Sequence, residues 1–239
     1  MKSEESTSIQ KNNDGPSISI ERPYKPSWID LFNTWVENLP MSVWVFNLLL
    51  GIGLILIHLI FFWWDNNLQT EEIIPIIIFN SLAIPYLLVF IYLLDKQALH
   101  ALETMRPVLD MAEEDYTDFE YRLSTMPFLA PLLAGSLIMI MTILLPTVTI
   151  SPARYAVLEQ LPTFKVVFHI LDKSSAFLFG VLILHTIRQL RLVNQINKRV
   201  THINLFQLSP LQAFSRLTGS TACLLYTSPS PRDNQPHRV

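Results

Sequence analysis

Four long apolar runs dominate the pattern of hydrophobic and polar positions along the chain. Each run holds about 21–22 residues, and an α-helix needs about 20 residues to cross the hydrocarbon core of a bilayer. Inside lipid every backbone N–H and C=O must be paired within its own segment, so such runs form helices. The pattern predicts an all-α integral membrane protein, a four-helix fragment with spans at Val43–Trp64, Ile73–Leu94, Phe128–Val148 and Val166–Ile187.

A shorter amphipathic pattern precedes the first span. Ser27 and Asp30 fit a capping-box start, and Pro40 stops the helix. Two tryptophans and a phenylalanine on one face suit the headgroup boundary, and we expect Asp30 and Glu37 on the polar face. We predict an interfacial helix within 23–40; the alternative is a helix packed on the end of the bundle. The apolar positions at helical spacing are Trp28, Leu31, Phe32, Trp35, Val36 and Leu39.

The connections have helical content of their own. The 95–127 loop is expected to continue the helix of the second span. Its residue pattern then predicts a short helix at about 112–123, whose acidic residues face outward. Those acids match no calcium-loop spacing, so a solvated acidic face is favoured over a metal site. The fourth span is expected to run on as a basic juxtamembrane helix, either on the membrane surface or as the start of a signalling coiled coil. Within 191–222, Ser209 and Pro210 begin a helix that we expect to be a truncated fifth span.

Lysine and arginine gather on one side of the predicted spans. The other side has only Arg154 and Lys165, and its 65–72 loop has three acids and no basic residue. The positive-inside rule therefore places the N-terminus, the 95–127 loop and the chain beyond Ile187 in the cytoplasm. We expect no signal peptide and a location in the plasma membrane. The ten basic residues of the cytoplasmic side are Arg22, Lys25, Lys96, Arg106, Arg122, Arg188, Arg191, Lys198, Arg199 and Arg216.

Composition agrees with membrane placement and narrows the partners. Half of the residues are hydrophobic, 15% are charged, and the mean hydropathy of +0.34 is high for a soluble domain. A net charge of −3 without a large basic patch argues against a nucleic-acid partner. Cys223 is the only cysteine, which excludes a disulfide framework and a cysteine-based metal site. The expected partners are the lipid bilayer and, at the cytoplasmic face, other proteins.

The two ends of the chain differ from the rest. Residues 1–22 are polar and are predicted to form a disordered cytoplasmic tail. Cys223–Asp233 resembles the conceptual translation of a transposase-type sequencing adapter, because one choice of codons reproduces that adapter; the alternative is a disordered tail rich in Ser and Pro. The resemblance implies that the native sequence stops near Ala222, that 223–239 is non-native and that the reading frame is truncated.

Ionisable side chains inside the predicted spans are the candidates for chemistry, because a charge in the bilayer core is costly. His169 and Asp172 share one helix face at i and i+3, toward the predicted outer end of the fourth span. His185 is a further ionisable residue of that span. Residues at similar depth complete a candidate outer-leaflet polar cluster, which consists of His58, Asn80, His169, Asp172 and Lys173.

This candidate cluster has several interpretations. It could bind a transported substrate or relay protons, hold a metal through two histidines and Asp172, or ligate a haem between His58 and His169. The plain alternative is that Asp172 and Lys173 form a boundary pair in water and that each histidine makes an interhelical hydrogen bond. We assign no metal, no cofactor and no catalytic residue to the cluster.

Motifs for nucleotide or hydrolytic chemistry are absent from the sequence. It contains no P-loop, no G-x-G-x-x-G, no G-x-S-x-G and no H-E-x-x-H. Six glycines leave little material for phosphate-binding loops. We therefore lean against an enzyme and expect a truncated sensor- or scaffold-type membrane module. The alternatives are a transporter or channel subunit that uses the outer polar cluster and, third, a haem-binding redox protein.

Three segments carry a resemblance to known sequences. RPVLDM at Arg106–Met111, YRLSTMP at Tyr121–Pro127 and INLFQLSPLQAFSRLT at Ile203–Thr218 resemble uncharacterised multi-pass prokaryotic membrane proteins. The resemblance implies membrane placement and a missing C-terminal part. No function accompanies it, and it assigns no catalytic residue.

Overall fold

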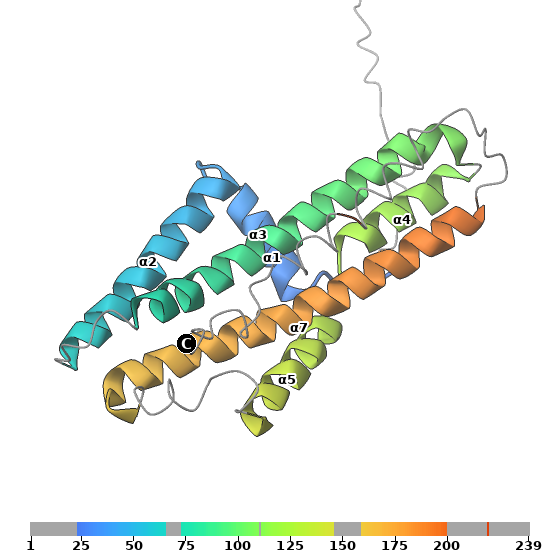
Figure 1. Cartoon of the computed structure of the whole chain (residues 1–239). Helices are drawn as coiled ribbons and strands as arrows, with labels where there is room; N and C mark the ends of the chain where they lie inside the picture. Colours follow the sequence, from blue (N-terminus) through green and yellow to red (C-terminus); the bar gives the residue numbers. More distant parts are fainter. Residues whose placement is uncertain (1–22, 66–72, 110, 146–158, 200–218, 220–239) are drawn as a thin grey trace, which may run out of the picture.

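The computed structural model describes residues 23–65, 73–109, 111–145, 159–199 and 219. Within these residues the fold is all-helical, with six α-helices, one 3₁₀ turn and no strand, which confirms the all-α part of the prediction (Figure 1). The predictions for 1–22, for the chain beyond 199 and for 223–239 lie outside the described helices. In chain order the elements are α1 (Trp28–Glu37), α2 (Val43–Trp64), α3 (Ile74–Met105), η1 (Arg106–Val108), α4 (Glu113–Ser124), α5 (Leu129–Leu144) and α7 (Pro162–Arg199).

Three of these helices are long and apolar enough to cross a membrane. They are α2 with 22 residues, α3 with 32 residues and the Pro162–Ile196 part of α7 with 35 residues. They cover the predicted spans at 43–64, 73–94 and 166–187. Large apolar side chains also point outward, since Leu48 of α2 is 64% exposed and Leu133 of α5 is 70% exposed. Outward apolar side chains on long helices are typical of a surface that faces lipid.

The helix observed in place of the predicted span at Phe128–Val148 is shorter than that span. Its helix, α5, holds 16 residues and is about 24 Å long at 1.5 Å per residue. It ends at Leu144, and Leu145 has a non-helical backbone with φ −118° and ψ 60°. The physical reason is Pro146, because a residue that precedes proline is disfavoured in the α region. The sequence therefore overestimates the length of this helix, and the described structure holds three long apolar helices instead of four.

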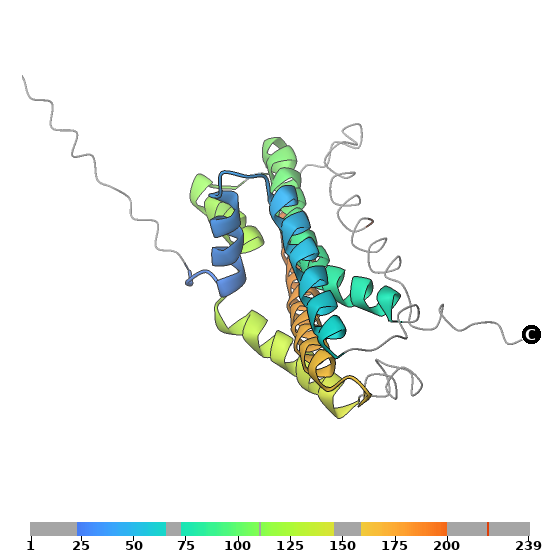
Figure 2. The ribbon, with the colours of Figure 1, turned by 90° about the vertical axis from the view of Figure 1, so that its left-hand side faces the viewer.

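The two longest helices, α3 and α7, run side by side along the molecule (Figure 1). The helix α2 packs against α3, α5 crosses α7, and α4 lies against both long helices near their far ends. After a turn of 90°, α1, α4 and α5 lie on one flank and α2, α3 and α7 on the other (Figure 2). We call the end that holds α1 and α4 the α4 end, and the opposite end, where α2 stops and α7 begins, the Asp65 end.

A capping contact joins two helices at the Asp65 end. The backbone N–H of Phe164, in the first turn of α7, donates a hydrogen bond of 2.8 Å to Oδ2 of Asp65. Asp65 is itself the residue that closes α2. A carboxylate stabilises the positive end of a helix dipole, so the backbone of Asp65 closes α2 and its side chain caps the start of α7. Pro162 at the first position of α7 suits a helix start because its missing N–H would have no helical partner there.

The helices α5 and α7 approach each other closely at two glycines. A Cβ atom placed on Gly180 would lie 2.6 Å from the backbone oxygen of Ala134 and 3.0 Å from Cα of Gly135. A Cβ atom on Gly135 would in turn lie 2.5 Å from the ring of Phe177. Small residues at a helix crossing allow the backbones to approach, which is a common packing mode in membrane proteins.

The helix α1 covers Trp28–Glu37 and begins with the expected capping box, in which Ser27 and Asp30 bond each other's backbone N–H. One expectation for this helix is wrong. Asp30 does not lie on an exposed polar face but is buried, because it docks against the segment that precedes α5. Conversely, Trp35 is 54% exposed although it is apolar. Helical periodicity indicates which residues share a face but not which face meets a neighbour.

The predicted helical content of the 95–127 loop is confirmed. Helix α3 continues to Met105, and α4 presents Glu113, Glu114 and Asp115 in its first turn. On the inner side of α4 Tyr116 is buried, and the Arg106 guanidinium lies 4.7 Å from its ring centroid. Burial raises the pKa of the Tyr116 hydroxyl, with a smaller contribution from the charge of Glu120, so this side chain stays neutral at ordinary pH.

Candidate functional site

His58 and Asn80 of the predicted outer cluster meet at α7. The side-chain amide of Asn80 donates a hydrogen bond of 3.2 Å to the backbone oxygen of Phe168. His58 is fully buried, and its ring centroid lies 6.4 Å from that of Phe168. His58 Nδ1 lies 2.7 Å from Oγ of Ser81 and 3.2 Å from the backbone oxygen of Leu54, while Nε2 has no hydrogen-bond partner among the described residues. These residues form a polar contact between α2, α3 and α7 inside an aromatic surround.

Lys173 of α7 reaches toward α5, and Asp172 pairs with it. The Lys173 ammonium lies 2.9 Å from Oδ2 of Asp172 and donates a hydrogen bond of 3.4 Å to the backbone oxygen of Thr142. The residue four positions after Thr142 is Pro146, which has no N–H to offer that oxygen. A lysine near a helix C-terminus also interacts favourably with the helix dipole. Lys173 therefore serves as a capping residue for the end of α5.

The predicted residues thus fall into two groups. His58 and Asn80 contact Phe168. Asp172 pairs with Lys173, and Lys173 in turn bonds the end of α5. His169 lies next to Phe168 in the sequence, with ring centroids 5.9 Å apart. Within the described ranges no three His, Cys, Asp or Glu side chains come together in a way that could hold a metal ion.

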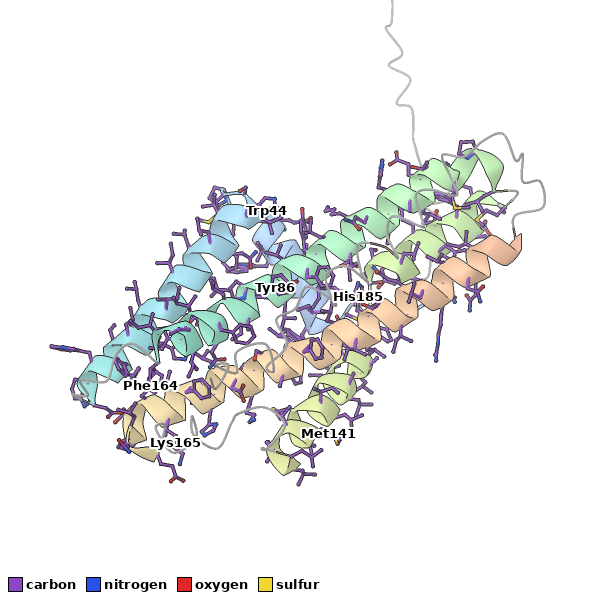
Figure 3. The ribbon with its side chains drawn as sticks, in the orientation of Figure 1. Trp44, Tyr86, Met141, Phe164, Lys165 and His185 are labelled. Atoms are coloured by element: carbon purple, nitrogen blue, oxygen red, sulfur yellow. The ribbon has the colours of Figure 1, made fainter. Side chains whose placement is uncertain are left out.

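The most polar part of the core lies nearer the α4 end, between α3 and α7. His185 Nε2 lies 2.8 Å from Oδ1 of Asp95. One turn further along α7, the amide of Gln189 donates a hydrogen bond of 3.2 Å to the same Oδ1 atom. All three residues are buried. Figure 3 labels His185 on α7, where that helix runs beside α3.

Asp30 of α1 adds a second buried carboxylate at this level. Its Oδ2 atom accepts hydrogen bonds from the Ser27 N–H at 2.8 Å, the Ser27 hydroxyl at 2.8 Å and the Met126 N–H at 2.9 Å. An antiparallel bridge between Pro26 and Pro127 extends the contact. One carboxylate therefore joins α1 to the segment that links α4 and α5.

Arg188 connects the same segment to α7. Its guanidinium donates hydrogen bonds to the backbone oxygen of Thr125 and to the hydroxyl of Tyr24, and it lies 5.2 Å from the Tyr24 ring centroid. The Tyr24 hydroxyl also donates to the Thr125 oxygen at 2.9 Å, and Tyr121 of α4 donates to the Tyr24 backbone oxygen at 2.7 Å. We define the inner polar cluster as Tyr24, Asp30, Asp95, Tyr121, Thr125, His185, Arg188 and Gln189.

The inner polar cluster is the stronger functional candidate. Two carboxylates and an imidazole that are buried in a mostly apolar bundle are costly unless they are paired, and intramembrane ionisable groups usually have a functional reason. The inner polar cluster joins α1, α3 and α7 to the segment between α4 and α5.

Sequence reasoning missed this cluster although it singled out His185. A usable signal was present, because His185 and Gln189 are spaced i and i+4 on one face of the fourth span. Asp95 lies one residue beyond the predicted end of the second span, within the predicted loop, and Asp30 was expected on the polar face of the interfacial helix. Comparisons with models of known protein families, with curated proteins and with solved structures found no match for the chain.

Proposed function

We propose that the chain is a multi-pass protein of the plasma membrane and acts as a sensor- or scaffold-type module. In this proposal the α4 end is cytoplasmic, as the distribution of Lys and Arg indicates, and α1 lies at the inner membrane surface. Its partners are the lipid bilayer and proteins that meet the exposed acidic side of α4, where Glu113 and Glu114 lie. Three long apolar helices support the membrane placement.

The observation that carries the proposal is the buried pair of Asp95 and His185 between the two longest helices. Two further side chains connect its surroundings to the periphery, since Asp30 bonds Met126 and Arg188 bonds Thr125. A shift of α7 relative to α3 would therefore move α1 and the segment after α4 with it. A rigid connection of this kind is what a sensor needs to pass a change inside the membrane to a surface that other proteins can contact.

Hydrogen exchange of the full chain in lipid nanodiscs tests the coupling. Asp95→Asn keeps the shape of the side chain and removes its charge, so we expect the backbone amides of α1 and α4 to lose protection together. The matched control is Asp118→Asn, which removes a charge from an exposed pair with Arg122 on the surface of α4. Unchanged exchange of α1 in Asp95→Asn, or a response of α4 without α1, would contradict the proposal.

A transporter or channel subunit remains the alternative, and His58 is the observation that favours it. This histidine is fully buried between three helices, and its Nε2 atom has no hydrogen-bond partner in the described part of the chain. The alternative predicts a proton flux in vesicles loaded with a pH-sensitive dye, and a loss of that flux in His58→Gln. Vesicles that stay tight with the wild-type protein would argue against it.

A further inference from the structure

A cavity of about 480 Å³ lies where α1, α3, α5 and α7 meet. Eight of its ten lining residues carry apolar chains or rings, and the other two are Lys173 and Ser174 of α7. Its volume and its mostly apolar lining are typical of a site for a small organic molecule. Because α3 and α7 are long enough to cross a membrane, the ligand to expect is one that dissolves in lipid.

The cavity runs from a buried end to an exposed end. At the buried end Leu178 is 7% exposed, and the ring of Phe177 contacts that of Trp28, with centroids 6.0 Å apart. At the other end Ile170 also lines the cavity but is 60% exposed, and it lies within the predicted span at Val166–Ile187. The two ends are about 12 Å apart along α7, at 1.5 Å per residue. A ligand can therefore keep its head at the buried end and extend a tail past Ile170 into lipid.

Two hydrogen-bond donors belong to the lining of the cavity. The indole N–H of Trp28 is buried and has no partner among the described residues, whereas a buried tryptophan N–H usually has one. An ammonium group has three N–H donors, and the structure gives two of those of Lys173 a partner. These partners are Asp172 Oδ2 at 2.9 Å and the Thr142 backbone oxygen at 3.4 Å, so one donor remains for a ligand.

The donors indicate a neutral ligand with two acceptors. Ser174 adds no third donor, because its hydroxyl already donates to the backbone oxygen of Ile170 at 2.8 Å. Asp172 balances the charge of Lys173, so a neutral acceptor fits better there than an anion. Lys173 is the one charged residue among the ten that line the cavity, and none lies beside Trp28. A phosphate group at the buried end would therefore be an unpaired charge, which is costly.

We propose that this cavity binds a lipid-soluble para-quinone. Such a quinone is a flat, neutral ring whose two carbonyl groups point in opposite directions, and its apolar tail is attached beside one of them. The inner carbonyl accepts the N–H of Trp28, and the carbonyl beside the tail accepts the remaining N–H of Lys173. The ring packs on Phe177, and the tail leaves past Ile170. The inference rests on the proposed membrane placement of the long helices but not on the sensor role.

Equilibrium binding of a para-benzoquinone with a decyl tail tests the site. The full chain is reconstituted in lipid nanodiscs, and we expect saturable binding of one quinone per chain. The control ligand carries the same tail on a tetramethylbenzene ring, which is flat but has no carbonyl, and it should bind at least about tenfold more weakly. Equal binding of the two rings would show a merely apolar cavity and overturn the proposal.

Flotation of the chain with liposomes separates this inference from the membrane placement on which it rests. A chain that floats with the lipid but binds no quinone would overturn the quinone site alone. A chain that does not float would overturn the membrane placement and the quinone site together.

Two tryptophan variants make the test specific to the proposed contacts. Trp28→Phe keeps an aromatic ring and removes the N–H, and we expect it to bind the quinone about fivefold more weakly. Trp44→Phe changes a residue of α2 that is 59% exposed and outside the lining, and it should bind as the wild type does. The carbonyl stretching band of the bound quinone, at lower wavenumber than in lipid alone, should move part of the way back in Trp28→Phe.

Lys173→Met removes the second donor and provides an independent variant if Trp28→Phe does not fold. It should weaken binding by a similar factor and shift the band of the other carbonyl, which a quinone with a single isotopically labelled carbonyl distinguishes. An affinity and a band that neither variant changes would refute the binding mode.

Discussion

Substitution of Gly180 by alanine tests the close contact of α5 with α7 directly. The added Cβ would lie 2.6 Å from the Ala134 backbone oxygen and 2.9 Å from Cγ1 of Ile138. The two helices would have to separate by several tenths of an ångström, because the nearest obstacle is backbone and not the end of a flexible side chain. Overpacking of this kind costs about 1–3 kcal/mol. The replacement of glycine by alanine also gains about 1 kcal/mol of helix propensity, which offsets part of that cost.

The chain offers a matched control for the propensity term. Gly53 lies inside α2, and a Cβ atom built on it has no neighbour within 4 Å. Gly53→Ala therefore gains the same propensity without the clash and is expected to stabilise the protein by up to about 1 kcal/mol. The free energies of unfolding of the two variants, measured by denaturant titration in bicelles, should differ by about 1–3 kcal/mol. Equal stability of the two variants would show that α5 and α7 are not in contact at Gly180.

Three further substitutions have defined outcomes. Asp30→Ala leaves the buried N–H of Met126 without its acceptor, and the loss of about 2 kcal/mol should appear as faster amide exchange throughout α1; normal exchange there would mean that α1 does not need this contact. His185→Leu removes the imidazole that lies 2.8 Å from the buried Asp95 carboxyl and should lower the free energy of unfolding by about 1–3 kcal/mol. The double variant with Asp95→Leu should recover most of that loss, and a double variant as unstable as the single one would contradict the pairing. Arg122→Ala removes an exposed ion pair on α4 and should change stability by less than about 1 kcal/mol, which the same titration measures.

Most helix positions follow from hydrophobic patterning and from stop signals. The apolar run at Val43–Trp64 coincides with α2, and the acidic pattern near 112–123 coincides with α4 apart from one residue at each end. Patterning succeeds here because helix formation in an apolar environment depends on local composition. It fails at the end of α5 because a single proline, Pro146, outweighs the apolar residues around it.

The candidate site was less accessible from the sequence because it depends on tertiary neighbours. A helical wheel places Asp30 on the polar face of its helix. In the fold Asp30 is buried, and it accepts the N–H of Met126, which lies 96 positions further along the chain. Depth alone groups Asp172 with His58, but His58 contacts Ser81 and Phe168 whereas Asp172 pairs with Lys173. The rotation of α7 about its axis decides which residues meet, and no periodic pattern in one helix reveals the rotation of another.

The length of α5 has a consequence for the membrane itself. At about 24 Å this helix is shorter than a hydrocarbon core of about 30 Å, whereas α2, with 22 residues, reaches about 33 Å. In a bilayer that the three long helices cross, lipid beside α5 would thin, or polar headgroups would sink toward its ends, while lipid beside α2 would keep its ordinary thickness. The protein would therefore impose a lopsided deformation on the bilayer, and such a deformation costs less in thin membranes, in short-chain lipid, and where two copies share the thinned patch.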